Sequence, residues 1–299
     1  MKKILICKTG ALGDVLRTTP ILRILKGEIF WVSSKEGKEI LPKIKNLKIL
    51  TPNKLNILKK INFDLILNLE EDEDLVKKIS ILKTKKLIGV YFDFKKNKIL
   101  YTKESKKWYD MSLISKYGKE MANLLKWKNR KTYQEILFEM LGKKFKGENY
   151  LINYNYFNKP KTKEIIIAIE KRAGNKWPMK VWPYYDLLKN KIEKEGYKVF
   201  YLKQRKKIID YIKDIDKASI LICGDTLAMH LGLALNKKVI ALFTCTSPWE
   251  IYDYNRMKKI INPMLKKAFY RRDYDEKLVK AIKLKNIFKA FKEIINSWI

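Results

Sequence analysis

Two loops of this chain place a carboxylate beside glycine where a strand is expected to give way to a helix. The first loop contains Thr9, Gly10, Gly13 and Asp14, between an apolar run and a helical pattern. Ligands of open α/β sheets bind at the carboxyl ends of strands, and a carboxylate there can take a proton from a substrate hydroxyl. Asp14 is therefore a candidate general base. The alternative is that Asp14 caps the helix and that the two glycines shape a turn.

The first loop lacks the residues of two common nucleotide-binding motifs. A Walker loop needs lysine after its last glycine, whereas Asp14 follows Gly13. A dinucleotide fingerprint needs three glycines and an acidic residue about 20 positions later, whereas the next apolar run ends in Ser33 and Ser34. A P-loop and a nicotinamide cofactor are both disfavoured, and no cofactor is expected.

The second loop lies within residues 220–230, where an apolar strand runs into Gly224, Asp225 and Thr226. A helix that starts here offers free backbone N–H groups and the positive end of its dipole, which predicts a diphosphate site. His230 lies about one turn inside that helix, close enough to flank a diphosphate. The alternative is that Asp225 is a helix cap and that His230 is packed inside the protein.

A third segment, residues 174–183, precedes another expected helix and contains Lys180 between Trp177 and Trp182. A lysine there can neutralise phosphate. The two tryptophans can equally well be packing residues.

Apolar runs that alternate with helical patterns predict a parallel, doubly wound sheet in each half of the chain. The first half has predicted strands at 3–8, 28–32, 47–50, 64–69 and 86–90, a helix that starts at Asp14 and stops by Gly27, and helical periodicity over 108–141. The second half has predicted strands at 164–169, 197–202, 218–223 and 238–243, and helices at 183–195, 208–217, 226–235 and 278–298. The polar stretch 153–163 separates the halves, and we place the domains at 1–158 and 159–299.

Composition narrows the class of protein further. A length of 299 residues suits two domains, and 46% hydrophobic residues supply buried cores. Three scattered cysteines exclude a disulfide framework, and the single histidine excludes a metal site that needs two imidazoles. No apolar run approaches the roughly 18 residues of a membrane span, so we expect a cytoplasmic protein. The formal net charge of +34 predicts attraction to nucleic acid, anionic lipid or phosphorylated substrates.

Three segments together resemble glycosyltransferase family 9, the ADP-heptose:lipopolysaccharide heptosyltransferases. Residues 8–22 resemble the family's N-terminal signature, residues 224–235 its Asp-Thr-Gly-x-x-His donor motif, and residues 180–183 its Lys-x-Trp-Pro element. Their order agrees with the family over nearly the whole chain. Leu227 departs from the donor motif, because it stands where the family has glycine.

The resemblance implies a GT-B fold, in which two Rossmann-like domains face a cleft and a C-terminal helix packs back across both. It implies an inverting glycosyltransferase without a bound metal, which moves a heptose-like sugar from a nucleoside diphosphate donor to a glycan or glycolipid acceptor in lipopolysaccharide biosynthesis. In this family the acceptor binds the N-terminal domain, and Asp14 is then the catalytic base. The implied donor-binding residues are Thr9, Gly10, Gly13, Lys180, Asp225, Thr226, Met229 and His230.

Two other functions stay open from the sequence. A nucleic-acid-binding protein would use the surplus charge and interleaved aromatics such as Trp127 between Lys126 and Lys128, but the lysines are spread along the chain, so nucleic acid is disfavoured as a partner. A sugar-nucleotide epimerase of the same fold would keep the donor site and lack an acceptor. For a transferase, the charge leaves open peripheral contact with the anionic inner face of the cell membrane through residues 108–131. The competing explanation is that the lysine enrichment is compositional and that these lysines only form a solvated surface.

Overall fold

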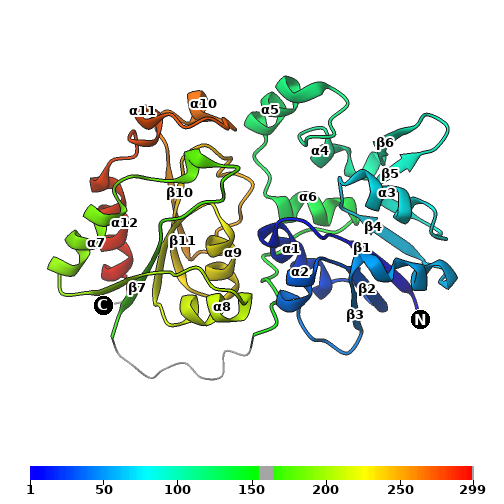
Figure 1. The fold of residues 1–299 in the computed structure, drawn as a ribbon, viewed down its shortest axis with the longest axis horizontal. Helices are drawn as coiled ribbons and strands as arrows, with labels where there is room; N and C mark the ends of the chain where they lie inside the picture. Colours follow the sequence, from blue (N-terminus) through cyan, green and yellow to red (C-terminus); the bar gives the residue numbers. More distant parts are fainter. Residues whose placement is uncertain (155–163, 298–299) are drawn as a thin grey trace. The chain divides into compact units, whose positions relative to one another are not determined.

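The computed structural model describes residues 1–154 and 164–297. The chain forms two compact units, Met1–Tyr154 and Asn155–Ile299 (Figure 1). The predicted domain boundary between residues 158 and 159 lies outside the described residues, as does most of the polar stretch around it. Each unit contains one sheet with helices packed against it, which confirms the α/β class and the two mainly parallel sheets.

The N-terminal unit is built on a sheet of strand order β3-β2-β1-β4-β5-β6. Its strands are parallel except for β6, which pairs antiparallel to β5. The strands are β1 (Lys3–Cys7), β2 (Glu28–Val32), β3 (Leu47–Leu50), β4 (Leu65–Asn68), β5 (Leu87–Asp93) and β6 (Lys98–Tyr101). The helices are α1 (Leu12–Thr18), α2 (Lys35–Ile40), α3 (Glu73–Ser80), α4 (Lys106–Tyr109), α5 (Gly118–Lys128) and α6 (Tyr133–Met140), with 3-10 turns at Thr19–Arg23, Pro52–Lys60 and Lys103–Ser105.

The C-terminal unit is built on a parallel sheet of order β11-β10-β9-β7-β8. In Figure 1, α7 and α12 cover one face of this sheet, and α8 and α9 lie on the other. The strands are β7 (Ile166–Glu170), β8 (Lys198–Tyr201), β9 (Ile220–Gly224), β10 (Lys238–Phe243) and β11 (Met257–Ile261). The helices are α7 (Tyr185–Lys194), α8 (Ile208–Asp216), α9 (Leu227–Ala234), α10 (Leu265–Ala268), α11 (Glu276–Val279) and α12 (Leu284–Asn296), with a 3-10 turn at Pro178–Lys180.

The central strands are buried on both faces, which explains why they are almost continuously apolar in sequence. In β1, Leu5, Ile6 and Cys7 have no exposed surface, and β9 is buried along its whole length. Two rigid strands of this kind end directly before the first and second loops. The fold therefore holds both loops at the carboxyl edges of their sheets.

Two long helices of the sequence prediction are broken in the structure. The periodic segment 108–141 contains the separate helices α4, α5 and α6. Helix α4 ends at Tyr109, Gly118 takes φ +78° where α5 starts, and Asn129 is extended after α5. The predicted C-terminal helix 278–298 is divided between α11 and α12, since Lys283 is extended at the N-cap of α12. The apolar face of α12, with Ile287 and Phe291, packs into the core of its own unit.

Five further elements were not among the ranges predicted from the sequence: the helices α2, α3 and α10, and the strands β6 and β11. The two strands lie at sheet edges, are short and contain lysine, so neither is a continuous apolar run like a buried strand. Within residues 1–154 and 164–297, no helix is both long and apolar enough to cross a bilayer.

Candidate active site

The first loop places Asp14 inside a helix rather than at its cap. Helix α1 starts after Ala11, which has φ +32° and ψ 108° and makes no side-chain cap. Asp14 lies in the first turn, where its carboxylate pairs with the guanidinium of Arg17 at 2.9 Å. The capping alternative for Asp14 is therefore wrong. The Asp14 side chain keeps 35% of its surface exposed, so the carboxylate can meet a substrate.

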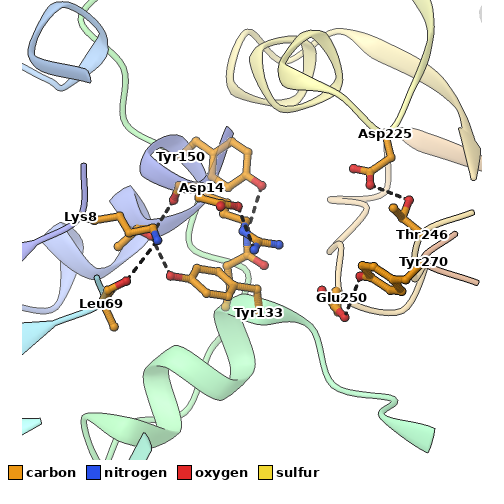
Figure 2. A network of polar contacts seen from close by, with 12 residues as sticks. Lys8, Asp14, Leu69, Tyr133, Tyr150, Asp225, Thr246, Glu250 and Tyr270 are labelled. Atoms are coloured by element: carbon orange, nitrogen blue, oxygen red, sulfur yellow. Dashed lines mark hydrogen bonds and ion pairs between the residues drawn. The ribbon is translucent and has the colours of Figure 1, made fainter. Parts of the chain in front are cut away.

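Two neighbours in the first loop hold the chain against the end of strand β4. Lys8 donates from Nζ to the carbonyl oxygen of Leu69 at 3.1 Å (Figure 2), and the backbone N–H of Thr9 donates to the carboxylate of Glu70. Burial alone would lower the pKa of Lys8, but the negative charges of Asp14 and Glu70 raise it above its ordinary value. Lys8 is therefore a fixed cation at neutral pH. Gly10 is exposed at the tip of the loop.

These residues line a cavity of about 250 Å³ that belongs entirely to the N-terminal unit. One wall is aromatic, because the guanidinium of Arg17 lies 4.2 Å from the ring centre of Tyr133 and 5.3 Å from that of Trp108. The lining residues are Lys8, Gly10, Ala11, Asp14, Arg17, Leu69, Glu70, Glu71, Asp72, Trp108, Tyr109 and Tyr133.

Sequence reasoning missed Glu70 and Glu71, which lie beside Asp14 in this cavity. Glu70 is 5% exposed. Burial raises the pKa of Glu71, against the lowering effects of the Lys8 charge and a hydrogen bond with Ser112. A usable signal was present, because the two carboxylates directly follow the buried strand β4 at the carboxyl edge of a parallel sheet.

The second loop forms a largely buried ion pair in the C-terminal unit. Lys180 lies 3.1 Å from the carboxylate of Asp225. The hydroxyl of Thr246 donates to the same carboxylate at 2.6 Å, as Figure 2 shows. Burial would raise the pKa of Asp225, but the charges of Lys180 and His230 and the hydrogen bond from Thr246 lower it to about 2. Asp225 is therefore ionised throughout the physiological range. The structure brings Lys180 and Asp225 together, although they are far apart in the sequence.

Helix α9 starts at the N-cap Thr226, which makes no side-chain cap. Asp225 is therefore not the cap of this helix either. The Oγ1 atom of Thr226 is buried and has no hydrogen-bond partner within the described residues. His230 is 5% exposed and Met229 is fully buried, so both side chains pack inside the unit. The open N-terminus and the unpartnered hydroxyl form a site that suits an anion.

In the third segment, residues 174–183, both the backbone and the side chain of Lys180 lie close to the second loop. A Cβ atom added to Gly224 would lie 3.3 Å from the carbonyl oxygen of Lys180, so glycine permits this close approach. Trp182 is 1% exposed and donates from Nε1 to the carbonyl oxygen of Ile282 at 3.0 Å. The packing alternative is therefore correct for Trp182. The guanidinium of Arg272 lies 3.7 Å from the ring centre of Trp177.

A second charged group at the same sheet edge was also missed. Glu170 ends β7 and pairs in register with Cys223, next to the second loop. Arg172 contacts its carboxylate at 2.8 and 2.6 Å, and the hydroxyl of Tyr211 donates to it at 2.5 Å. Arg172 is thereby held at the carboxyl edge, where a negatively charged ligand would lie. Across residues 1–154 and 164–297, no three His, Cys, Asp or Glu side chains are grouped so that they could hold a metal ion.

Comparisons with known proteins agree with this arrangement. Residues 205–278, which include the second loop, match the family model described as glycosyltransferase family 9 (heptosyltransferase). A family 9 glycosyltransferase structure from Veillonella parvula is 15% identical, with a TM-score of 0.69 over 99% of this chain and 98% of that chain. No curated protein matches this chain in sequence.

Two further solved structures come from E. coli. The heptosyltransferase WaaC with ADP-2-deoxy-2-fluoro heptose is 15% identical, with a TM-score of 0.59 over 97% of this chain and 99% of that chain. The ADP-heptose lps heptosyltransferase II is 12% identical, with a TM-score of 0.58 over 99% of each chain. Residues 205–278 therefore resemble the heptosyltransferases of glycosyltransferase family 9, and the solved structures show that the chain has the two-domain fold of those enzymes over nearly its whole length.

Proposed function

We propose that this protein transfers a heptose-like sugar from a nucleoside diphosphate donor to a hydroxyl group of a glycan or glycolipid, as in lipopolysaccharide biosynthesis. The donor class is supported by the family match and by the fold shared with WaaC, whose structure was solved with ADP-2-deoxy-2-fluoro heptose. ADP-heptose is accordingly the first donor to test.

The observation that carries this proposal is the half-buried carboxylate of Asp14 in the cavity of the N-terminal unit. An acceptor hydroxyl is a poor nucleophile at neutral pH, so a base must take its proton as it attacks. The ion pair with Arg17 favours the ionised carboxylate, which is the form a base requires. The hydroxyl oxygen then bonds to the anomeric carbon while the nucleoside diphosphate leaves with the electron pair. This single displacement inverts the anomeric centre.

The leaving diphosphate needs positive charge, and we propose that groups of the C-terminal unit supply it. The N-terminus of α9 supplies backbone N–H groups, and the free hydroxyl of Thr226 supplies a further donor. Lys180 adds a cation whose position is fixed by Asp225. Asp225 would then orient this lysine or accept a hydrogen bond from a donor hydroxyl.

The other donor contacts rest on the family resemblance. Thr9, Gly10 and Gly13 belong to the first loop, and the exposed Gly10 leaves room for a ligand because nothing lies within 4 Å of an added Cβ atom. Met229 and His230 lie in α9 and are buried. We propose that these two side chains support the donor site from behind, close to Asp225.

The experiment that tests the proposal is transfer of heptose from ADP-heptose by the Asp14→Asn variant. We expect kcat to fall about 10²–10⁴-fold, the usual effect of losing a general base, while the Kd for ADP stays within about twofold. Asp74→Asn is a matched control, because Asp74 is an exposed carboxylate in the first turn of α3 and does not line the cavity. An Asp14→Asn variant that keeps more than about a tenth of kcat would contradict the assignment.

We also propose peripheral contact with the anionic inner face of the cell membrane. Tyr117, Met121 and Leu124 are 47%, 43% and 43% exposed, and their spacing places them on one face of α5. Leu113, just before this helix, is 82% exposed. Exposed lysines lie on the same segment at positions 116, 119 and 128. An apolar face flanked by cations suits the surface of an anionic leaflet.

A further inference from the structure

The cavity of the N-terminal unit has a charge opposite to that of the chain. The chain carries a formal net charge of +34. Carboxylates nevertheless outnumber cations in the cavity lining. The carboxylates are Asp14, Glu70, Glu71 and Asp72, and the cations are Lys8 and Arg17.

Both cations are already engaged by the protein. Arg17 pairs with Asp14 at 2.9 Å and stacks on Tyr133. Lys8 donates to the carbonyl oxygen of Leu69 at 3.1 Å and lies close to the charges of Asp14 and Glu70. An anionic ligand would therefore have to compete with carboxylates that the fold holds in place.

The excess of acid does not depend on the ionisation of one residue. Burial raises the pKa of Glu71, so this carboxyl takes up a proton at a higher pH than an ordinary glutamate does. With Glu71 neutral, the three carboxylates Asp14, Glu70 and Asp72 still outnumber the two cations. A protonated Glu71 would in addition donate a hydrogen bond to a ligand oxygen.

The cavity wall also contains a buried hydroxyl, that of Tyr109, which lacks a partner among the described residues. Tyr109 is 1% exposed, and its Oη atom is buried without a hydrogen-bond partner among the described residues. The charges of Glu71 and Glu70 act on this hydroxyl, and both residues line the cavity with Tyr109. Since buried polar groups are almost always partnered, a ligand oxygen in the cavity would complete the hydrogen bond.

We propose that this cavity binds a sugar unit that carries hydroxyl or amino groups and no anionic substituent, with Tyr109 and Glu71 as specificity-determining residues. Hydroxyl groups can donate to the carboxylates and accept from Tyr109, whereas an anionic substituent would meet like charge at short range. A volume of about 250 Å³ suits one sugar, because it lies just below the roughly 300–1,000 Å³ of pockets for drug-sized ligands. That this sugar belongs to the acceptor rests on the proposed function; its chemical class follows from the cavity alone.

Binding of three simple glycosides to the full chain tests this proposal. Methyl glucoside, methyl glucosaminide and methyl glucuronide are neutral, cationic and anionic at neutral pH, and their Kd values are measured by NMR titration without donor. We expect the glucuronide to bind at least about tenfold more weakly than the other two. A glucuronide that binds as tightly as the glucoside would overturn the proposal. Because no donor is present, an absence of heptose transfer together with the expected order of affinities would count against the proposed function alone.

Substitutions locate the effect within the cavity. At pH 8, Glu71→Gln should reduce the ratio between the Kd values of the glucuronide and the glucoside severalfold. Tyr109→Phe should raise the Kd of the glucoside severalfold. Glu73→Gln is the matched control, because Glu73 is 57% exposed, pairs with Lys77 and does not line the cavity. If the ratio between the Kd values of glucuronide and glucoside is the same in Glu71→Gln as in Glu73→Gln, Glu71 does not determine specificity. Circular dichroism of each variant verifies that the fold is retained.

Discussion

The buried ion pair at Asp225 gives a stability prediction whose size follows from the structure. The pKa of Asp225 falls from an ordinary 3.8 to about 2, and each tenfold change in proton affinity is worth roughly 1 kcal/mol, so the ionised form contributes about 2 kcal/mol to folding. Because the folded pKa lies below the unfolded one, this contribution is complete above about pH 5. It decreases as the pH falls through 3.8 and is roughly halved at pH 3. We expect Asp225→Asn to lower the free energy of unfolding by about 2–3 kcal/mol at neutral pH.

Urea unfolding of the full chain at pH 7 and pH 3 measures this contribution. The loss caused by Asp225→Asn should be about half as large at pH 3 as at pH 7. Asp210→Asn is a matched control, since Asp210 is 47% exposed and its pair with Lys213 spans 3.6 Å; exposed pairs contribute about 0–1 kcal/mol. A loss for Asp225→Asn that is equal at both pH values would refute the argument from ionisation. If Asp225→Asn lowers the free energy of unfolding no more than Asp210→Asn does, the ion pair of Asp225 with Lys180 does not stabilise the fold.

Three further predictions concern metal, backbone and membrane. Exhaustive chelation should leave heptose transfer unchanged, and restoration of lost activity by Mg²⁺ would contradict the proposed stabilisation of the leaving group. Ala11→Gly should stabilise the protein by up to about 1 kcal/mol in urea unfolding, because φ +32° strains alanine; a destabilised variant would show that no strain is relieved. Sedimentation with anionic liposomes should fall when Tyr117, Met121 and Leu124 become serine and when salt is raised; an equal loss for Leu187→Ser, at a site 55% exposed, would leave only nonspecific adhesion.

The sequence predicts the strands well where burial dominates. Strands β1, β4 and β9 are apolar on both faces, so each is visible as a short continuous run. The edge strands β6 and β11 bury less surface and keep lysines, so no comparable run marks them. The breaks between α4, α5 and α6 depend on single backbone conformations, such as the positive φ of Gly118, which periodicity does not register.

Only part of the candidate site could be predicted from the sequence. Glycine-rich loops are a recognised sign of a ligand site, whereas strand ends without glycine carry no such sign. Asp14 and Asp225 stand beside glycines, and both are found at sheet edges. Glu70 and Glu170 have no such marker. Each follows or ends a buried strand, and the parallel topology alone brings it to the same edge as its loop. A search for polar residues directly after buried strands would have found both.

The contrast between a basic chain and an acidic cavity follows from the range of electrostatic interactions. Most lysines lie on exposed surfaces, where salt screens charges beyond about 8 Å at physiological ionic strength. The lining carboxylates act over shorter distances and partly out of water, as the raised pKa values of Glu71 and Lys8 indicate. The overall charge can therefore attract the protein to an anionic surface, while four fixed carboxylates decide which group enters the cavity. Replacing surface lysines should weaken binding to an anionic surface without altering which sugar the cavity binds. Glu71→Gln should alter which sugar the cavity binds without weakening binding to an anionic surface.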